Sequence, residues 1–237
     1  MNSSAPVPAL FHLVRRILAL ATGLLLVGCA ATPQAPVSMA PNALASGMRV
    51  GVTMSNLPDS DLHLPGASCL LCLATAEAMN SSLSNYVNGL KPNEFSVVKS
   101  QLIGLLEEKG IYVVPIETPF NATEFPKSSS KEANTSPRDF SQLRDQYNVT
   151  HLLVVDVEHL GMWRSYANYI PTSDPMAYLK ASSYLVNLAN NQYVWFQPLE
   201  FKRPADGDWD EPPSFPGLTN AYFQVLEEAR ESIVSEF

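Results

Sequence analysis

His151–Leu160, with the sequence HLLVVDVEHL, is the stretch that decides the fold. Its start is a continuous apolar run, Leu152–Val155, in place of the alternation of a strand with one wet face. Such a run is typical of a central strand buried on both faces of a sheet. The sequence therefore predicts a sheet with other elements packed on both sides of this strand.

The residues before this strand predict a βααβα order. MRVGVTM (48–54) alternates as a strand does, and Ser68 can cap a helix that runs to about Asn88. A second helix opens at Pro92-Asn93 and ends at Gly110, with apolar residues at helical spacing. A strand over 111–117, a polar loop over 118–135 and a helix after Ser136-Pro137 follow.

The residues after it predict a hairpin and a last helix. AYLKASSYLVNLA (177–189) and QYVWFQPLEFK (192–202) are two long strands joined at Asn190-Asn191, where asparagine tolerates the positive φ of a tight turn. An amphipathic helix follows over about 218–235. The whole order is β-α-α-β-α-β-β-β-α, which predicts an α/β or α+β fold: a mixed sheet of about five strands with helices packed on its faces.

The N-terminus predicts export. Arg15 and Arg16 precede an uncharged apolar run, Ile17–Gly28, which is too short to span a bilayer and is typical of a secretory signal peptide. Its last residues and the next one, Leu26-Val27-Gly28-Cys29, resemble the lipobox of bacterial lipoproteins. The resemblance implies cleavage before Cys29, lipidation of Cys29 and a membrane anchor made of that covalent lipid. It also implies the periplasmic side of the envelope and the inner leaflet of the outer membrane, because Ala30 stands where an aspartate usually signals retention.

Three segments follow from this reading: a signal peptide (1–28), a lipidated cysteine with a Pro-rich tether (29–47) and one globular domain (48–237). Removing 1–28 takes away two arginines and no acid, so the formal charge of −8 becomes −10. This acidity argues against nucleic acid as a partner.

The order of elements behind a lipobox resembles envelope lipoproteins with a domain like the N-terminal domain of TolB, including curli-secretion lipoproteins and lipoprotein activators of penicillin-binding proteins. RVGV (49–52), LLEEKGIYVV (105–114), YNVTHLLVVDVE (147–158) and KASSYLVNLANNQYVW (180–195) carry the resemblance. Thr150-His151 stands near the usual Ala-Asp of these families, and Asn190-Asn191 replaces their Thr-Gly turn. The resemblance implies a scaffold or assembly role and no enzymatic activity.

Cys69 and Cys72 form a CxxC pair inside the apolar stretch GASCLLCLATAEAM (66–79). In an exported protein the pair is compatible with a structural disulfide, with core thiols or with a redox site at a helix N-terminus. The histidines are scattered, so the sequence predicts no metal site. The apolar residues of this stretch are expected to form the buried side of a helix.

Aromatic residues are dense between positions 163 and 196, and four of them are candidates for either burial or a protein interface: Trp163, Tyr166, Tyr193 and Trp195. In regular alternation Tyr193 and Trp195 share one strand face. No nucleophile or phosphate-binding motif accompanies them.

The sequence therefore predicts a non-enzymatic, lipid-anchored binding or assembly component of the bacterial cell envelope, with a membrane and an unknown envelope protein as partners. Two alternatives stay open. One is a thiol-redox or metal-binding protein that uses Cys69 and Cys72. The other is a membrane-inserting oligomeric secretion component, in which Leu64–Met79 enters the bilayer and the chain forms a homo-oligomer.

Overall fold

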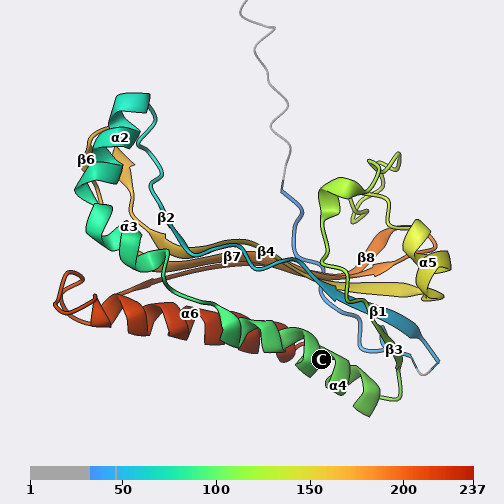
Figure 1. Cartoon of the computed structure of the whole chain (residues 1–237). Coiled ribbons are helices and arrows are strands. Elements are labelled where there is room, and N and C mark those ends of the chain that lie inside the picture. Colours follow the sequence, from blue (N-terminus) through green and yellow to red (C-terminus); the bar gives the residue numbers. More distant parts are fainter. Residues whose placement is uncertain (1–32, 46) are drawn as a thin grey trace, which may run out of the picture. The chain divides into compact units, whose positions relative to one another are not determined.

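The structure is a computed structural model that describes residues 33–45 and 47–237. Its main sheet has the order β3-β1-β4-β7-β8, and β2 pairs with the far half of β4 (Figure 1). The strands are β1 (Arg49–Met54), β2 (Asp61–His63), β3 (Tyr112–Pro115), β4 (His151–Trp163), β5 (Tyr166–Ala167), β6 (Ile170–Pro171), β7 (Met176–Asn187) and β8 (Gln192–Pro204). The helices are α2 (Leu70–Met79), α3 (Ser81–Val87), α4 (Val98–Glu108), α5 (Gln142–Tyr147) and α6 (Pro216–Val234), with 3-10 turns η2 (Asn93–Val97) and η3 (Ala122–Glu124).

The predicted fold class is confirmed: this is a mixed α/β fold with helices on the sheet faces. Strand β4 is central, since β1 and β2 pair with it in parallel and β7 pairs with it in antiparallel. Leu152–Val155 are completely buried, as the continuous apolar run predicts.

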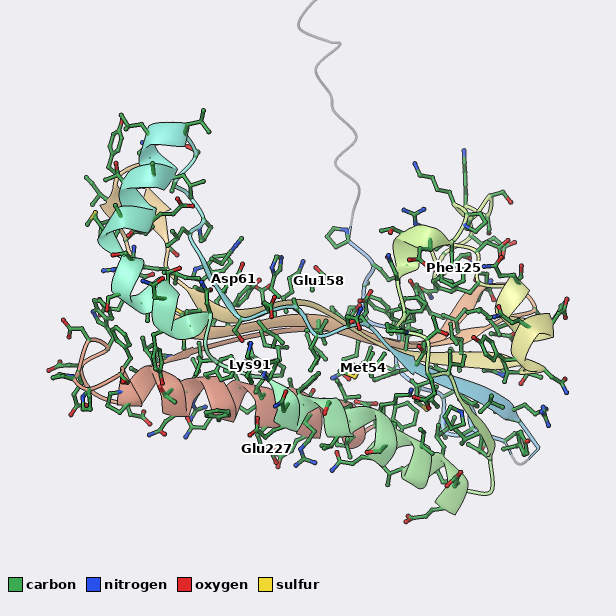
Figure 2. The ribbon with its side chains drawn as sticks, in the orientation of Figure 1. Met54, Asp61, Lys91, Phe125, Glu158 and Glu227 are labelled. Atoms are coloured by element: carbon green, nitrogen blue, oxygen red, sulfur yellow. A yellow bond between two sulfur atoms is a disulfide. The ribbon has the colours of Figure 1, made fainter. Side chains whose placement is uncertain are left out.

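One face of the sheet, here called the helix-covered face, packs against α4 and α6 (Figure 1). Leu102 and Leu106 of α4 and Tyr222 and Val225 of α6 are buried there with the inward side chains of the strands. Figure 2 shows Glu227 on the outer side of α6 and Glu158 on the opposite side of the sheet. The large apolar core of the protein therefore lies on this face.

The opposite face, here called the open face, is covered at one end only. There α5 and the segment after β3 bury a second, aromatic cluster that includes Phe120, Phe140 and Tyr184. The rings of Phe120 and Phe140 lie 5.5 Å apart, edge to face. Towards β2 the open face carries His63, His159 and Trp163, whose rings contact one another.

Part of the segment predicted as a tether, residues 29–47, contacts the domain. Val37 exchanges two backbone hydrogen bonds with Phe196, of 2.9 and 3.0 Å, on the edge strand β8. Met39 and Leu44 pack against the core of the helix-covered face. These apolar residues give the segment contacts that its prolines and small residues do not predict, and the segment protects the edge of β8.

The predicted helix over 68–88 is interrupted. Helix α2 ends at Met79 and α3 begins at Ser81, with buried Asn80 between them. The expectation that this apolar stretch is core is wrong for most of it, because only Cys72 and Ala76 of α2 are buried.

A β-bulge in β8 explains where the predicted aromatic residues lie. Leu185 pairs with Trp195 and Val186 with Tyr193, so Val194 is an extra residue. Trp195 consequently packs in the core of the helix-covered face, whereas Tyr193 packs in the aromatic cluster of the open face. Regular alternation predicts that Tyr193 and Trp195 share a face, and the bulge places them on opposite faces.

Candidate functional site

The surface that stands out is a projection formed by α2, the loop before it and the β5–β6 hairpin (Figure 1). We call residues 64–79 and 165–173 the apolar tip. It stands away from the sheet on the side opposite α4 and α6.

The tip concentrates exposed apolar side chains. Leu70, Leu71 and Ile170 are 91%, 68% and 67% exposed. Of the nine large apolar side chains that are exposed among the described residues, six belong to the tip: Leu70, Leu71, Leu73, Met79, Tyr169 and Ile170. Scattered exposed leucines are ordinary, but a group of them on one projection marks an interaction surface.

The outer part of the tip carries no charge. Residues 64–76 and 165–173 contain no Asp, Glu, Lys, Arg or His, and Glu77 is the first charged residue of α2. The core of a protein interface and a membrane-contacting surface both have few charges. The outer part of the tip therefore suits an apolar contact.

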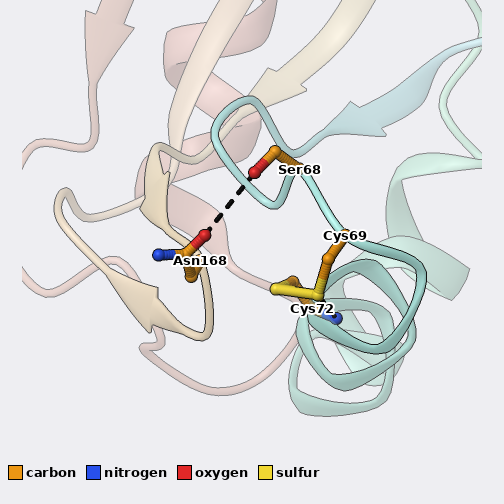
Figure 3. The surroundings of a disulfide bond; sticks show 4 residues. All are labelled: Ser68, Cys69, Cys72 and Asn168. Atoms are coloured by element: carbon orange, nitrogen blue, oxygen red, sulfur yellow. Dashed lines mark hydrogen bonds between the residues drawn. A yellow bond between two sulfur atoms is a disulfide. The ribbon is translucent and has the colours of Figure 1, made fainter. Parts of the chain in front are cut away.

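Covalent and hydrogen bonds hold the outer tip in shape (Figure 3). Cys69 and Cys72 form a disulfide across the first turn of α2. Cys69 is also the N-cap, where its Sγ accepts from the Cys72 backbone N–H at 2.9 Å. Ser68 Oγ donates to Asn168 Oδ1 at 3.5 Å, which links the loop to the hairpin. The loop, the helix start and the hairpin thus form one unit.

Close backbone contact joins the loop to the hairpin. The Tyr166 N–H donates to Pro65 O at 2.8 Å, and the Asn168 N–H donates to Gly66 O at 3.1 Å. Gly66 has φ +87°, and a Cβ at this position would lie 1.9 Å from Tyr166 O. Only glycine allows this approach.

A buried polar network fixes the base of the tip. Asn80 Nδ2 donates to Ala76 O at 2.7 Å and to Tyr166 Oη at 2.6 Å. Arg164 Nη1 donates to Asn80 Oδ1 at 2.7 Å, and its guanidinium lies over the Trp209 ring at 4.9 Å. Asn80 therefore connects α2, the hairpin and the end of β4.

Replacing Asn80 with alanine is expected to loosen the tip. The variant leaves the Tyr166 hydroxyl and one Arg164 N–H without their buried partner, at a cost of about 1–3 kcal/mol. We expect faster amide hydrogen exchange over residues 64–80 and little change in the sheet. An Asn85→Ala control removes an exposed asparagine of α3 and should leave exchange unchanged; equal exchange in both variants contradicts the role of Asn80.

The open face next to the tip carries a ring cluster. His63 lies 5.2 Å from both His159 and Trp163 between ring centroids, and Lys202 Nζ lies 3.7 Å above the Trp163 ring. Burial lowers the pKa of His63, and His159 and Lys202 lower it further against the opposing effect of Asp61. The cluster contains two histidines, His63 and His159. In the described part of the chain, no group of three or more His, Cys, Asp or Glu side chains is placed to hold a metal ion.

A polar cleft of about 570 Å³ lies at the carboxyl ends of β1 and β3. Its walls include Ser55, Asn121, Glu124 and Asp156, and no basic side chain lines it. The carboxyl ends of adjacent parallel strands are a common place for ligands. The lining can accept hydrogen bonds from a small polar molecule.

Burial raises the pKa of Asp156 above its ordinary value of 3.8, Glu158 adds to this, and a hydrogen bond from Ser55 opposes it. A carboxyl whose folded pKa is raised favours folding when protonated, and that stability is lost as pH rises through the folded pKa. Asp156→Asn is therefore expected to raise the midpoint of chemical unfolding at pH 7, with the gain shrinking towards pH 4. An Asp174→Asn control, at an exposed site, should show no such pH-dependent gain.

The candidate residues from the sequence lie in different places. Cys29 lies outside the described residues, and so do the signal peptide and the lipobox. Cys69 and Cys72 are in the tip, whereas Trp163 belongs to the ring cluster of the open face. Tyr166, Tyr193 and Trp195 are buried in the structure.

The preferred reading of the sequence places the leucines of the tip in the core, and only the membrane-inserting alternative places 64–79 in a bilayer. A signal was present, because 64–76 is a charge-free run in which apolar residues occupy every side of the helix instead of one stripe. No helix among the described residues is long and apolar enough to span a membrane.

Comparison with known proteins finds only remote similarity to solved structures. No family model and no curated protein matches the chain. Among solved structures it is similar to lipoprotein GNA1162 from Neisseria meningitidis, with 14% identity over 80% of this chain and 96% of that one and a TM-score of 0.33. It is also similar to a putative neuraminyllactose-binding hemagglutinin homologue from Helicobacter pylori, with 12% identity, coverage of 85% and 87% and a TM-score of 0.40.

A PelC dodecamer from Paraburkholderia phytofirmans is a third similar structure, with 11% identity, coverage of 86% and 96% and a TM-score of 0.31. At such TM-scores and identities these likenesses carry no conclusion about function or assembly.

Proposed function

We propose that this protein is a non-enzymatic, lipid-anchored binding component of the bacterial cell envelope. Cys29 carries the anchor, the domain lies on the periplasmic side, and the apolar tip makes the functional contact. The observation that carries the proposal is the gathering of exposed apolar side chains on a projection whose outer part is uncharged and closed by a disulfide. The sequence Leu26-Val27-Gly28-Cys29 after a signal-like run supports the anchor, and Ala30 supports the outer membrane.

Fractionation of cells that express the full chain tests the anchor. We expect the native protein to stay in the outer-membrane fraction after an alkaline carbonate wash, which strips shallow peripheral contacts, and the Cys29→Ser variant to be released by the wash or retained as an unprocessed precursor. The Cys69→Ser/Cys72→Ser variant is the matched control, because it removes two cysteines and keeps the lipidation site, and it should stay with the washed membrane. A mature Cys29→Ser chain that withstands the wash as the native protein does contradicts the proposal.

One observation favours thiol exchange as a second candidate function. Cys69 is exposed at the N-terminus of α2 while Cys72 is buried, which is how an attacking and a resolving thiol are commonly arranged. Against it, no cationic side chain lies in residues 64–76 to stabilise a thiolate. After reduction, rapid alkylation of Cys69 at pH 6 in the folded protein supports this candidate, and alkylation only after unfolding excludes it.

A further inference from the structure

We propose that the apolar tip inserts into the surface of a phospholipid bilayer and so gives the protein a second, shallow membrane contact. The inference deepens the proposed function and rests on it, because the lipid on Cys29 supplies the nearby bilayer. The contact is interfacial: α2 has ten residues, about 15 Å of helix, and does not span a bilayer.

The chemistry of the tip fits lipid better than a protein partner. Leu70 and Leu71 lie in the first turn of α2, Tyr169 in the turn of the hairpin and Ile170 at the start of β6, and all four are exposed. Protein interfaces surround an apolar centre with a polar and charged rim, whereas the outer part of the tip, residues 64–76 and 165–173, has no charge. The charged residues next to these ranges in the chain include Glu77 near the end of α2, and Arg164 and Asp174 on either side of the hairpin. Tyrosine beside leucine and isoleucine suits the boundary between headgroups and acyl chains.

Local bonds fix the first turn of α2. Helix N-termini leave N–H groups without intrahelical partners. Here the Cys72 N–H, one of these groups, donates to Cys69 Sγ, and the Cys69–Cys72 disulfide closes the same turn. Leu70 and Leu71 lie within this closed turn, and both are exposed.

The proposed anchor keeps the domain close to a bilayer. Cys29 lies eight residues before Val37, and eight extended residues span at most about 28 Å. A lipid on Cys29 therefore holds the domain within a short distance of the membrane surface.

Vesicle flotation of the mature chain with Cys29→Ser tests the inference without the anchor. The compact unit from Ala35 to Phe237 contains the whole core, so the unlipidated chain is a folded protein. We expect it to float with phosphatidylethanolamine–phosphatidylglycerol vesicles and with zwitterionic phosphatidylcholine vesicles. We expect Leu70→Ser/Leu71→Ser to lower the partition coefficient at least tenfold.

The matched control is Val97→Ser/Phe223→Ser, which removes two exposed apolar side chains away from the tip and should leave flotation unchanged. No flotation, or equal loss in both double variants, overturns the inference. A third result also overturns the inference: the unlipidated chain self-associates in sedimentation, Leu70→Ser/Leu71→Ser abolishes this self-association, and the chain binds no vesicles. The tip is then an interface between copies of the chain.

The two proposals fail separately. An acylated Cys29 with no flotation of the unlipidated chain removes only the tip inference. If flotation depends on Leu70 and Leu71 but Cys29 of the native protein is unmodified, the anchor is contradicted and the tip contact is supported.

Discussion

Replacing Gly161 with alanine is expected to lower the free energy of unfolding by about 3–5 kcal/mol, the range of severe single substitutions. Gly161 has φ +133°, in a region that L-residues rarely adopt, and a Cβ here would lie 1.9 Å from Asp61 O and 2.6 Å from Asp61 N. The clash is with backbone, because Asp61 of β2 is the direct partner of Gly161 in β4. The sheet can accept the new atom only by separating these strands.

Urea unfolding followed by circular dichroism measures this effect. Gly104→Ala is the control: a Cβ at Gly104 in α4 meets nothing within 4 Å, and alanine is a better helix former by about 1 kcal/mol. We therefore expect Gly161→Ala to lower the free energy of unfolding and Gly104→Ala to raise it. A Gly161→Ala variant as stable as the native chain contradicts the close approach of β2 to β4.

Replacing Trp195 with alanine is expected to cost about 3–5 kcal/mol, because it removes a large side chain from a packed core. Trp195 is 2% exposed and meets the Phe237 ring edge to face at 5.2 Å between centroids. The loss leaves a cavity between β8 and the end of the chain that neighbouring strands cannot fill without breaking their pairing. A lower unfolding midpoint in urea is the expected result.

Trp209→Ala serves as the control for Trp195. Trp209 is only partly buried and stacks on Phe215 at 6.3 Å in the loop before α6. Its removal is expected to cost clearly less than that of Trp195. Equal costs, or no cost at Trp195, argue against burial of Trp195 and reopen its role as an interface residue.

The order of the main elements could be predicted because each has a periodic pattern of its own. The run Leu152–Val155 predicts a central strand, and the spacing of Leu102 and Leu106 predicts a helix with one buried face, as the structure has them. The short strand β2 could not be predicted, because three residues form a strand only by pairing with β4. The break at Asn80 likewise depends on partners far along the chain, Tyr166 and Arg164.

The tip was the hardest part to predict, for a physical reason. Apolar residues are buried in most soluble proteins, so Leu70, Leu71 and Leu73 suggest core when only the sequence is known. Whether they are buried depends on what the fold places opposite them, and the fold leaves α2 on a projection. The bulge at Val194 has the same character, since one extra residue sends Tyr193 and Trp195 to opposite faces.

Intact-mass spectrometry of the mature protein, purified in detergent from its membrane, tests the central claim most directly. The account predicts a chain that begins at Cys29 and carries the added mass of covalent acyl chains, with Cys69 and Cys72 oxidised. A mature chain that begins at another residue, or an unmodified Cys29 at its N-terminus, contradicts the lipid anchor on which the account depends.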